Sequence, residues 1–345
     1  MDVDKKDGIA NIAIVDSGID TGNKGFNNIL GGVCFEYNLK EESVIYSSNY
    51  HDENGHGTLC SSVIKKLMPN AGMFIVKILN EDAKTNSRVL IESLKYLLNT
   101  NIRLINLSIA TVEEDFKHEL NEICDLLYKN GKIIICSLDN KSNKSFPAVF
   151  QSVIGIRGSN FGFSNDYWYN SNYEIQCVAD TTPILVSGLN NTYTMFGGNS
   201  KATALFAGII LSILNMAPDI SFIELSNMLE NNAVKKCWME ENISIDLKIF
   251  DEIADRKSDY PQSELDIVQN ILVKALNLNA EAVPLLYINK LYHPKIGVNK
   301  FNCYNIVKDI ERELNIELNY NLISLNTFKS IYSLLDFIFG RDRSV

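Results

Sequence analysis

The chain has 345 residues, more than one compact domain usually needs. Hydrophobic residues make up 46% of it and charged residues 21%, a composition that excludes wholesale disorder. The net charge of −10 at pH 7 argues against a surface for nucleic acid or an anionic membrane, because both need clustered Lys and Arg. We therefore expect neither a nucleic acid nor a membrane as a partner.

Short apolar runs alternate with helical patterns from residue 11 to about residue 232. The expected strands are Ile12–Val15, Phe74–Leu79, Leu104–Leu107, Ile133–Cys136, Val153–Ile156 and Ile175–Val178. The expected helices between them are Thr58–Leu67, Ser87–Asn99 and Glu113–Lys129. The strands are apolar throughout, which is typical of a parallel sheet covered on both faces. The pattern predicts an α/β domain with a doubly wound parallel sheet in residues 1–240.

The longest apolar stretch runs from about Ala202 to Met216. It is interrupted by Ser212 and Asn215, and it is shorter than the roughly 20 residues that span a bilayer. We therefore predict a buried core helix here.

The character of the sequence changes near its last third. Residues 241–262 are acidic and irregular and are predicted to be a linker. Beyond them Ser263, three residues before Asp266, is expected to cap a helix. Further helical patterns cover Asn302–Leu314 and Leu325–Phe339. Residues 263–345 are therefore expected to form a small all-α module of four helices.

The cysteines point to a reducing compartment. They number seven, they are widely scattered, and none forms a CxxC pair: Cys34, Cys60, Cys124, Cys136, Cys177, Cys237 and Cys303. We expect reduced thiols that act as small apolar side chains, with no disulfide framework, no metal site and no cofactor. The first twenty residues also lack the apolar run of a secretory signal, so a cytoplasmic location is expected.

Three short motifs carry residues that suit acyl transfer. They are IAIVDSGID around Asp16, NGHGT around His56 and GGNSKATALFAG around Ser200. A serine nucleophile needs a base that takes its proton and an acid that orients the base. Here the Asp ends a predicted strand, and the His and the Ser each begin a predicted helix. Catalytic side chains belong at such carboxyl ends of parallel strands.

In motif content and in the order Asp, His, Ser, the chain resembles the subtilisin family of serine peptidases over residues 8–235. The resemblance implies that Ser200 is the nucleophile, His56 the general base and Asp16 the group that orients His56. It also implies that Asn140, in IIICSLDN, donates to the oxyanion of the tetrahedral intermediate. The partner that it implies is a peptide or protein substrate.

The resemblance also places a set of residues along the bound substrate, and several of them depart from the family pattern. These substrate-binding residues are Ser108, Ile109, Ala110, Leu138 and Asp139. The family's SLGG reads here SIAT, with Ala110 and Thr111 in place of two glycines. Its AAGN reads SLDN, with Asp139 for the glycine, and Lys201 directly follows Ser200. Asp139 could favour a basic residue before the cut, although a solvated loop carboxylate is the alternative.

Residues 263–340 resemble an acyl carrier protein, most clearly in IGVNKFNCYNIVKDIERELNIELN and LNTFKSIYSLLDFI. The family's attachment serine falls where Lys300 stands, and an ammonium group cannot carry phosphopantetheine. The resemblance implies a module without a prosthetic group that docks a protein partner or presents substrate. A generic helical cap is the alternative.

Three functions stay open. The first is an intracellular serine endopeptidase, which could process a precursor peptide in a biosynthetic pathway. The second is a pseudo-protease that only binds peptides, which Lys201 and the two lost glycines favour. The third is an acyl hydrolase or peptide ligase, because other nucleophiles can resolve the same acyl-enzyme. Retention of Asp16, His56, Ser200 and Asn140 favours the first.

Overall fold

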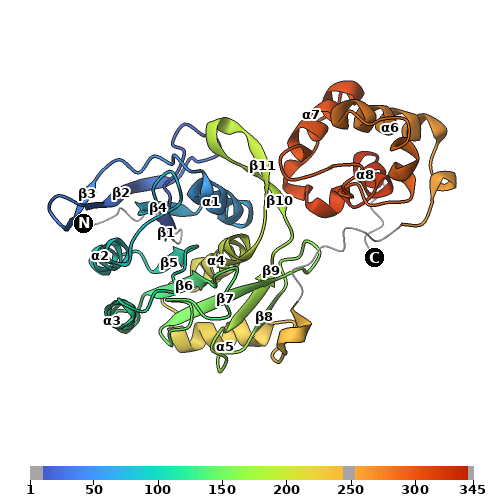
Figure 1. The fold of residues 1–345 in the computed structure, drawn as a ribbon. Helices are drawn as coiled ribbons and strands as arrows, with labels where there is room; N and C mark the ends of the chain where they lie inside the picture. Colours follow the sequence, from blue (N-terminus) through green and yellow to red (C-terminus); the bar gives the residue numbers. More distant parts are fainter. Residues whose placement is uncertain (1–10, 244–252, 341–345) are drawn as a thin grey trace. The chain divides into compact units, whose positions relative to one another are not determined.

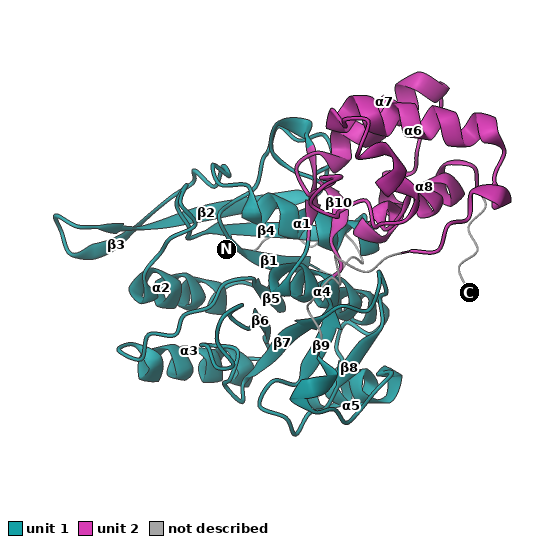
Figure 2. Cartoon of the chain, turned by 45° about the vertical axis from the view of Figure 1, so that its right-hand side comes forward, with its two compact units in different colours: residues 1–181, 187–192, 197–245 teal, residues 182–186, 193–196, 246–345 magenta. Residues whose placement is uncertain are grey.

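The computed structural model describes residues 11–243 and 253–340. The chain forms two compact units, drawn in two colours in Figure 2. Unit 1 comprises residues 1–181, 187–192 and 197–245, and unit 2 comprises residues 182–186, 193–196 and 246–345. Residues 244–252 of the expected linker lie outside the described residues, as do residues 341–345 of the expected module.

Unit 1 contains a nine-stranded, mostly parallel sheet in the order β3-β2-β4-β1-β5-β6-β7-β9-β8 (Figure 1). Only the pairs β2–β3 and β8–β9, at the two edges, are antiparallel. Its strands are β1 (Asn11–Asp16), β2 (Ile29–Asn38), β3 (Ser43–Ser47), β4 (Gly72–Lys77), β5 (Leu104–Leu107), β6 (Ile133–Ser137), β7 (Val153–Ser159), β8 (Tyr167–Tyr169) and β9 (Cys177–Asp180). The expected α/β class with a parallel sheet is confirmed.

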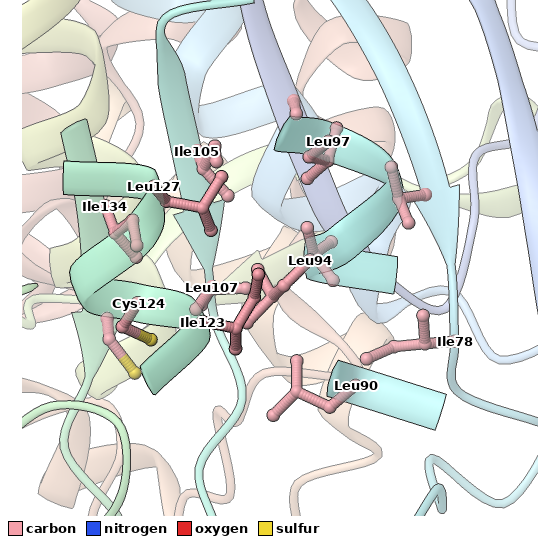
Figure 3. Packing of buried hydrophobic residues seen from close by; sticks show 14 of the residues in the cluster. Ile78, Leu90, Leu94, Leu97, Ile105, Leu107, Ile123, Cys124, Leu127 and Ile134 are labelled. Atoms are coloured by element: carbon pink, nitrogen blue, oxygen red, sulfur yellow. The ribbon is translucent and has the colours of Figure 1, made fainter. Parts of the chain in front are cut away.

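Helices cover both faces of this sheet, as its apolar strands predict. The helices of unit 1 are α1 (His56–Leu67), α2 (Ser87–Leu98), α3 (Lys117–Lys129), α4 (Asn199–Met216) and α5 (Phe222–Asn232). On one face, α2 and α3 pack together and bury Leu94, Ile123 and Leu127 against the strands (Figure 3). Helix α4 packs against α1 and against several strands, and most of its side chains are buried.

The strands at the centre of the sheet and the helices lie within a few residues of their predicted positions. The strands near the two edges of the sheet were not predicted. All six expected strands are present, but β2, β3 and β8 were not predicted. Strand β2 carries Gly31, Gly32 and the exposed Glu36, which interrupt its apolar run, and most of the edge strand β3 is exposed to water. Strand β8 is buried but has only three residues, too few to show a periodic pattern. Helix α3 begins at Lys117 rather than at Glu113.

Unit 2 differs from the expected all-α module of four helices. In its described residues the α-helices are α6 (Gln262–Leu276), α7 (Cys303–Leu314) and α8 (Ile331–Ile338), joined by loops and short 3-10 turns. The pattern expected over Leu325–Phe339 divides into a 3-10 turn and α8, and Ser330 caps α8. Ser263 lies inside α6 and is not its cap, because Pro261 precedes the first helical residue.

Two strands that precede Ser200 in the sequence also belong mostly to unit 2. Strands β10 (Ile184–Ser187) and β11 (Tyr193–Phe196) form a two-stranded sheet of their own. Their inward side chains Leu185 and Met195 are buried in the apolar cluster of α6, α7 and α8. The module was not expected to contain any strand. Among the described residues, no helix has the length and apolar character that a bilayer crossing would need.

Candidate active site

A cavity of about 370 Å³ opens in unit 1 where β5 and β6 end. Eight of the nine residues expected at the site line it: His56, Ser108, Ile109, Ala110, Leu138, Asp139, Asn140 and Ser200. The ninth, Asp16, is fully buried at the end of β1 and contacts His56. Residues 83–87 and Leu90 line the cavity as well, and sequence reasoning did not single them out. Their position after β4, at the same edge of the sheet, was the available signal.

The Asp16 carboxylate and the His56 imidazole form a close pair. His56 Nδ1 lies 2.8 Å from Oδ1 and 3.0 Å from Oδ2 of Asp16. An ionised carboxylate only accepts, so Nδ1 carries the hydrogen and Nε2 of the neutral ring is left as a base. Burial disfavours the charged imidazole, but the Asp16 charge and hydrogen bond outweigh it and hold the pKa of His56 well above its usual value. The His56 side chain is 27% exposed and remains accessible to a ligand.

Two glycines of the motifs allow Asp16 and His56 to approach. A Cβ on Gly57 would lie 2.3 Å from the Gly18 carbonyl oxygen and 3.1 Å from the Asp16 Cβ. Gly18 has a φ of +114°, and a Cβ there would lie 2.6 Å from the Tyr50 carbonyl oxygen. The glycines in DSGID and GHGT therefore have a steric cause: α1 begins against the loop that follows β1.

Asp52, which sequence reasoning missed, organises the start of α1. Its side chain is 1% exposed. Oδ1 accepts from the Ser17 hydroxyl at 2.9 Å and the Gly55 N–H at 2.7 Å. Oδ2 accepts from the Thr58 N–H at 2.9 Å and the Thr58 hydroxyl at 2.6 Å. A carboxylate that binds first-turn N–H groups stabilises a helix N-terminus. The sequence does contain a signal for this role, because Asp52 stands three residues before the Gly-His-Gly segment where the helix begins.

Ser200 is the second residue of α4, and its neighbours tie that helix start to the sheet. Asn199 Oδ1 accepts from the Gly158 N–H at 3.0 Å, and Asn199 Nδ2 donates to the Leu138 carbonyl at 2.9 Å. Ser200 Oγ lies 3.4 Å from the Ser108 carbonyl oxygen, which is longer than an ordinary O–H···O hydrogen bond. The Ser200 hydroxyl is therefore only weakly held in this conformation.

Lys201 points away from the cavity and into the interior. Its side chain is 1% exposed, and Nζ lies 2.8 Å from Oδ2 and 3.0 Å from the carbonyl oxygen of Asp180. Burial lowers the pKa of Lys201, and the Asp180 charge opposes that shift. The lysine that seemed to favour a non-catalytic protein is thus one half of a buried ion pair, and it leaves the cavity open.

The loop after β6 and the segment after β5 both line the cavity. Asn140 is exposed on this loop. The Asp139 carboxylate accepts from the Lys141 N–H at 2.8 Å, a local contact that holds the loop. Thr111 pairs with Phe146 through two backbone hydrogen bonds of 3.0 and 2.7 Å. This bridge joins the segment after β5 to the loop after β6.

Cys60 is a further neighbour of the pair that the sequence did not reveal. It lies one turn after His56 on α1, is fully buried, and its Sγ is 3.9 Å from His56 Nδ1. Burial raises the pKa of the Cys60 thiol, and the imidazole beside it opposes the shift. All seven cysteines are free thiols, and six of them are buried, as expected of small apolar side chains.

The family assignment agrees with this geometry. Residues 8–264 match the subtilase family, and the chain belongs to that family. It is a serine endopeptidase of the subtilisin-like class. The match extends beyond residue 235, where the resemblance in the motifs ended, and it includes the residues expected to form a linker.

Named relatives lie at low sequence identity. The chain is 25% identical to an intracellular serine protease of Paenibacillus polymyxa, over 60% of this chain and 67% of that protein. It is 26% identical to the major intracellular serine protease of Bacillus subtilis, over 59% and 67%. It is 23% identical to the minor extracellular protease Epr of Bacillus subtilis, over 65% of this chain but only 35% of that protein.

A solved structure shows the same fold. It is described as a cold adapted subtilisin-like serine proteinase, and it superposes with a TM-score of 0.55 at 17% identity. The superposition covers 69% of this chain and 87% of that one. The subtilisin-like α/β fold of the chain is therefore confirmed by comparison.

Proposed function

We propose that this chain hydrolyses peptide bonds through an acyl-enzyme on Ser200, with His56 as general base and Asp16 as the group that orients His56. The observation that carries the proposal is the 2.8 Å contact between His56 Nδ1 and Asp16 beside a cavity that both His56 and Ser200 line. That contact leaves Nε2 as the basic nitrogen. The buried position of Lys201 removes one argument for the pseudo-protease.

The proposed reaction has two halves. In the first, Ser200 Oγ attacks the scissile carbonyl carbon while His56 Nε2 takes the hydroxyl proton. The oxyanion accepts hydrogen bonds from the Asn140 side chain and from the Ser200 N–H. Ser200 lies in the first turn of α4, where backbone N–H groups have no partner within the helix and can donate to a ligand. The imidazolium then protonates the leaving amine. In the second half, water adds to the acyl-enzyme by the same proton route and frees Ser200.

A fluorophosphonate probe tests the nucleophile. We expect covalent labelling of the full chain that is lost in Ser200→Ala. Ser212→Ala is the matched control, because Ser212 lies on the same helix and its hydroxyl donates to the Ile209 carbonyl. Labelling that survives in Ser200→Ala, or that never occurs in the wild type, would refute the proposed mechanism. Peptide hydrolysis by the same three proteins, followed by mass spectrometry, separates a protease from a hydrolase of other acyl groups.

We further propose that the enzyme acts in the cytoplasm on a precursor peptide and that unit 2 serves as an acyl-carrier-like docking module. The named intracellular proteases among its relatives support the location. Lys300, at the place of the carrier's serine, is exposed before α7, and Phe301 next to it is 77% exposed. An exposed aromatic side chain beside a lysine is a suitable contact for a peptide or protein partner.

Docking is tested by a surface variant of unit 2. Cleavage sites are first mapped with a peptide library, and intact source proteins are then compared with short peptides that span the same sites. We expect Phe301→Ala to lower kcat/KM for an intact substrate about 10-fold while leaving the short peptide unchanged. Leu322→Ala, at a second exposed apolar residue of unit 2, is the control. Equal effects of Phe301→Ala on both substrates would count against docking at this residue.

A further inference from the structure

A buried side chain next to Ser200 links α4 to the loop that carries Asn140. Asn199, the first residue of α4, is 3% exposed. Its Nδ2 donates to the Leu138 carbonyl at 2.9 Å, and Leu138 stands two residues before Asn140. Asn199 itself stands directly before Ser200. One amide side chain thus joins the backbone next to the proposed nucleophile to the backbone next to the proposed oxyanion donor.

The other end of the same side chain is fixed on the sheet. Asn199 Oδ1 accepts from the Gly158 N–H, on β7, at 3.0 Å. A Cβ on Gly158 would lie 2.7 Å from Asn199 Oδ1, so this close approach of α4 to β7 needs a glycine. The amide oxygen meets an N–H group and the amide nitrogen meets a carbonyl, which fixes the orientation of the Asn199 amide.

The peptide unit between Leu138 and Asp139 is held at both ends. Its carbonyl accepts from Asn199, and its N–H, which belongs to Asp139, donates to Ser145 Oγ at 2.9 Å. Ser145 is fully buried. The Leu138 N–H donates to the Ile156 carbonyl of β7 at 2.8 Å. The backbone is therefore fixed up to the residue that directly precedes the proposed oxyanion donor.

The proposed oxyanion donor depends on this backbone for its position. Asn140 is exposed, so burial of its own side chain does not hold it in place. A catalytic group has to lie within about 0.5 Å of its productive position, and hydrogen bonds of the surrounding residues supply that precision. Asn199 joins the backbone before Asn140 directly to the first turn of α4, which carries Ser200.

We propose that Asn199 and Ser145 are positioning residues for the oxyanion donor: together they fix the peptide unit before Asn140 relative to the first turn of α4. Both act through their neighbours and not by touching the substrate. The proposal rests on the proposed function for its kinetic consequence, because Asn140 is the donor and Ser200 the nucleophile there. The contacts that carry it all lie within unit 1.

The first test follows the Asp139 amide by hydrogen exchange in the full-length protein. Asn199→Ala removes the donor to the Leu138 carbonyl and so frees one end of the peptide unit. We expect the Asp139 N–H, which donates to a buried hydroxyl in the wild type, to exchange about 10-fold faster in this variant. The measurement needs no turnover and reports on the position of the loop alone.

The matched control is Asn170→Ala, at another buried asparagine of unit 1. Asn170 Nδ2 donates to the Lys236 carbonyl at 2.5 Å, and its Oδ1 accepts from the Asn172 N–H at 2.9 Å. It lies at the sheet edge opposite the cavity, because it follows Tyr169, which pairs with the first residue of β9. We expect exchange at Asp139 within about 2-fold of the wild type in this variant. Equal acceleration by Asn199→Ala and Asn170→Ala would overturn the proposal.

The second test is a double-mutant cycle with Asn140→Ala. We expect Asn199→Ala to lower kcat about 10- to 100-fold with KM nearly unchanged, because a donor misplaced by about 1 Å loses most of its effect. In the Asn140→Ala background the same change is expected to lower kcat by less than about 3-fold, because the donor to be positioned is absent. A purely structural effect would multiply in full in both backgrounds, and that result would overturn the proposal.

Ser145→Ala covers a failure of Asn199→Ala to fold. It removes only a hydroxyl, and it frees the other end of the same peptide unit. The same coupling with Asn140→Ala is expected, and independent effects in this cycle would also overturn the proposal. An inactive wild type, or wild-type kcat in Asn140→Ala, would refute the proposed function. The exchange at Asp139 would then still decide whether Asn199 holds the peptide unit.

Discussion

At the scale of single residues, the hydrogen bond between Asp16 and His56 sets both the tautomer and the proton affinity of the base. The Asp16 charge stabilises the imidazolium and so raises the pKa of His56. Only the neutral imidazole accepts a proton, so activity rises as the pH rises through this pKa. The acid limb of the pH profile therefore lies at a higher pH than a free histidine would give.

Removing the Asp16 charge is expected to act on both properties. Asp16→Asn lowers the pKa of His56, moves the acid limb of kcat/KM to lower pH, and lowers kcat by about 10⁴ because the amide NH2 can donate to Nδ1 and favour the wrong tautomer. The measurement is a pH–rate profile from about pH 5 to about pH 9. An acid limb at the same pH in both proteins would contradict the assignment of His56 as the base.

Asn140 is exposed, so its loss is expected to affect catalysis and not stability. Asn140→Ala is predicted to lower kcat by about 10²–10³ with little change in KM, the size found for such a donor in a subtilisin. Lys141→Ala, at the next residue, is the control. Steady-state kinetics and thermal unfolding of both variants check this. A rate change of the same size in Lys141→Ala would point to disturbance of the loop instead of loss of the donor.

The residues that sequence reasoning found and missed differ in a physical way. Asp16, His56 and Ser200 stand within short motifs whose glycines have a local steric cause, so a pattern reveals them. Asp52 and Cys60 lie close to the Asp16–His56 pair only because α1 packs against the loop that follows β1. The Lys201–Asp180 pair joins residues 21 positions apart on two elements. Partners set by packing leave no short pattern in the sequence.

At the scale of elements, the start of α1 depends on a single buried carboxylate. Asp52→Ala removes the acceptor for the Gly55 and Thr58 N–H groups, and we expect a loss of about 1–3 kcal/mol in the free energy of unfolding. Activity is expected to fall as well, because α1 carries His56. Denaturant unfolding and peptide hydrolysis measure the two effects. Asp82→Ala, at an exposed loop residue, serves as control, and an equal loss there would argue against a special role for Asp52.

The ion pair behind Ser200 gives a second prediction for an element. Lys201→Met leaves the buried Asp180 carboxylate without its cation, which is expected to cost about 3–5 kcal/mol of stability. Adding Asp180→Asn removes the uncompensated charge and is expected to recover most of that loss. Thermal unfolding of the two single variants and the double variant measures the coupling. Additive effects in the double variant would show that the two side chains do not act as a pair.

The central strands were predictable because burial on both faces leaves a continuous apolar run, as in Ile12–Val15 and Ile133–Cys136. Strands β10 and β11 were not. Each has four residues, and their apolar side chains pack on helices that lie more than 60 residues later in the chain. A segment of four residues is too short to show the alternation of apolar and polar residues that marks a strand. Its conformation also depends on distant partners that the local sequence does not reveal.

At the scale of the whole molecule, the division into units predicts what a deletion of the C-terminal helices would do. Deleting residues 261–345 would remove the helices that bury Leu185 and Met195. We expect such a protein to lose activity on short peptides as well as on intact substrates, and to expose apolar surface that binds a hydrophobic dye. Peptide hydrolysis and dye fluorescence of the truncated chain check this. Full activity on short peptides would show that β10 and β11 hold their position without the helices.

The two strands ahead of Ser200 also have a consequence for how the enzyme first becomes active. During synthesis the chain emerges from its N-terminus, and Phe196 is made about 140 residues before the last buried leucines of α8. At about 5–20 residues per second, the ribosome needs roughly 7–30 s to cover that distance. All three motif residues exist during this interval, yet β11 still lacks the helices that hold it. The burial of Leu185 and Met195 is therefore complete only after α8 has been made.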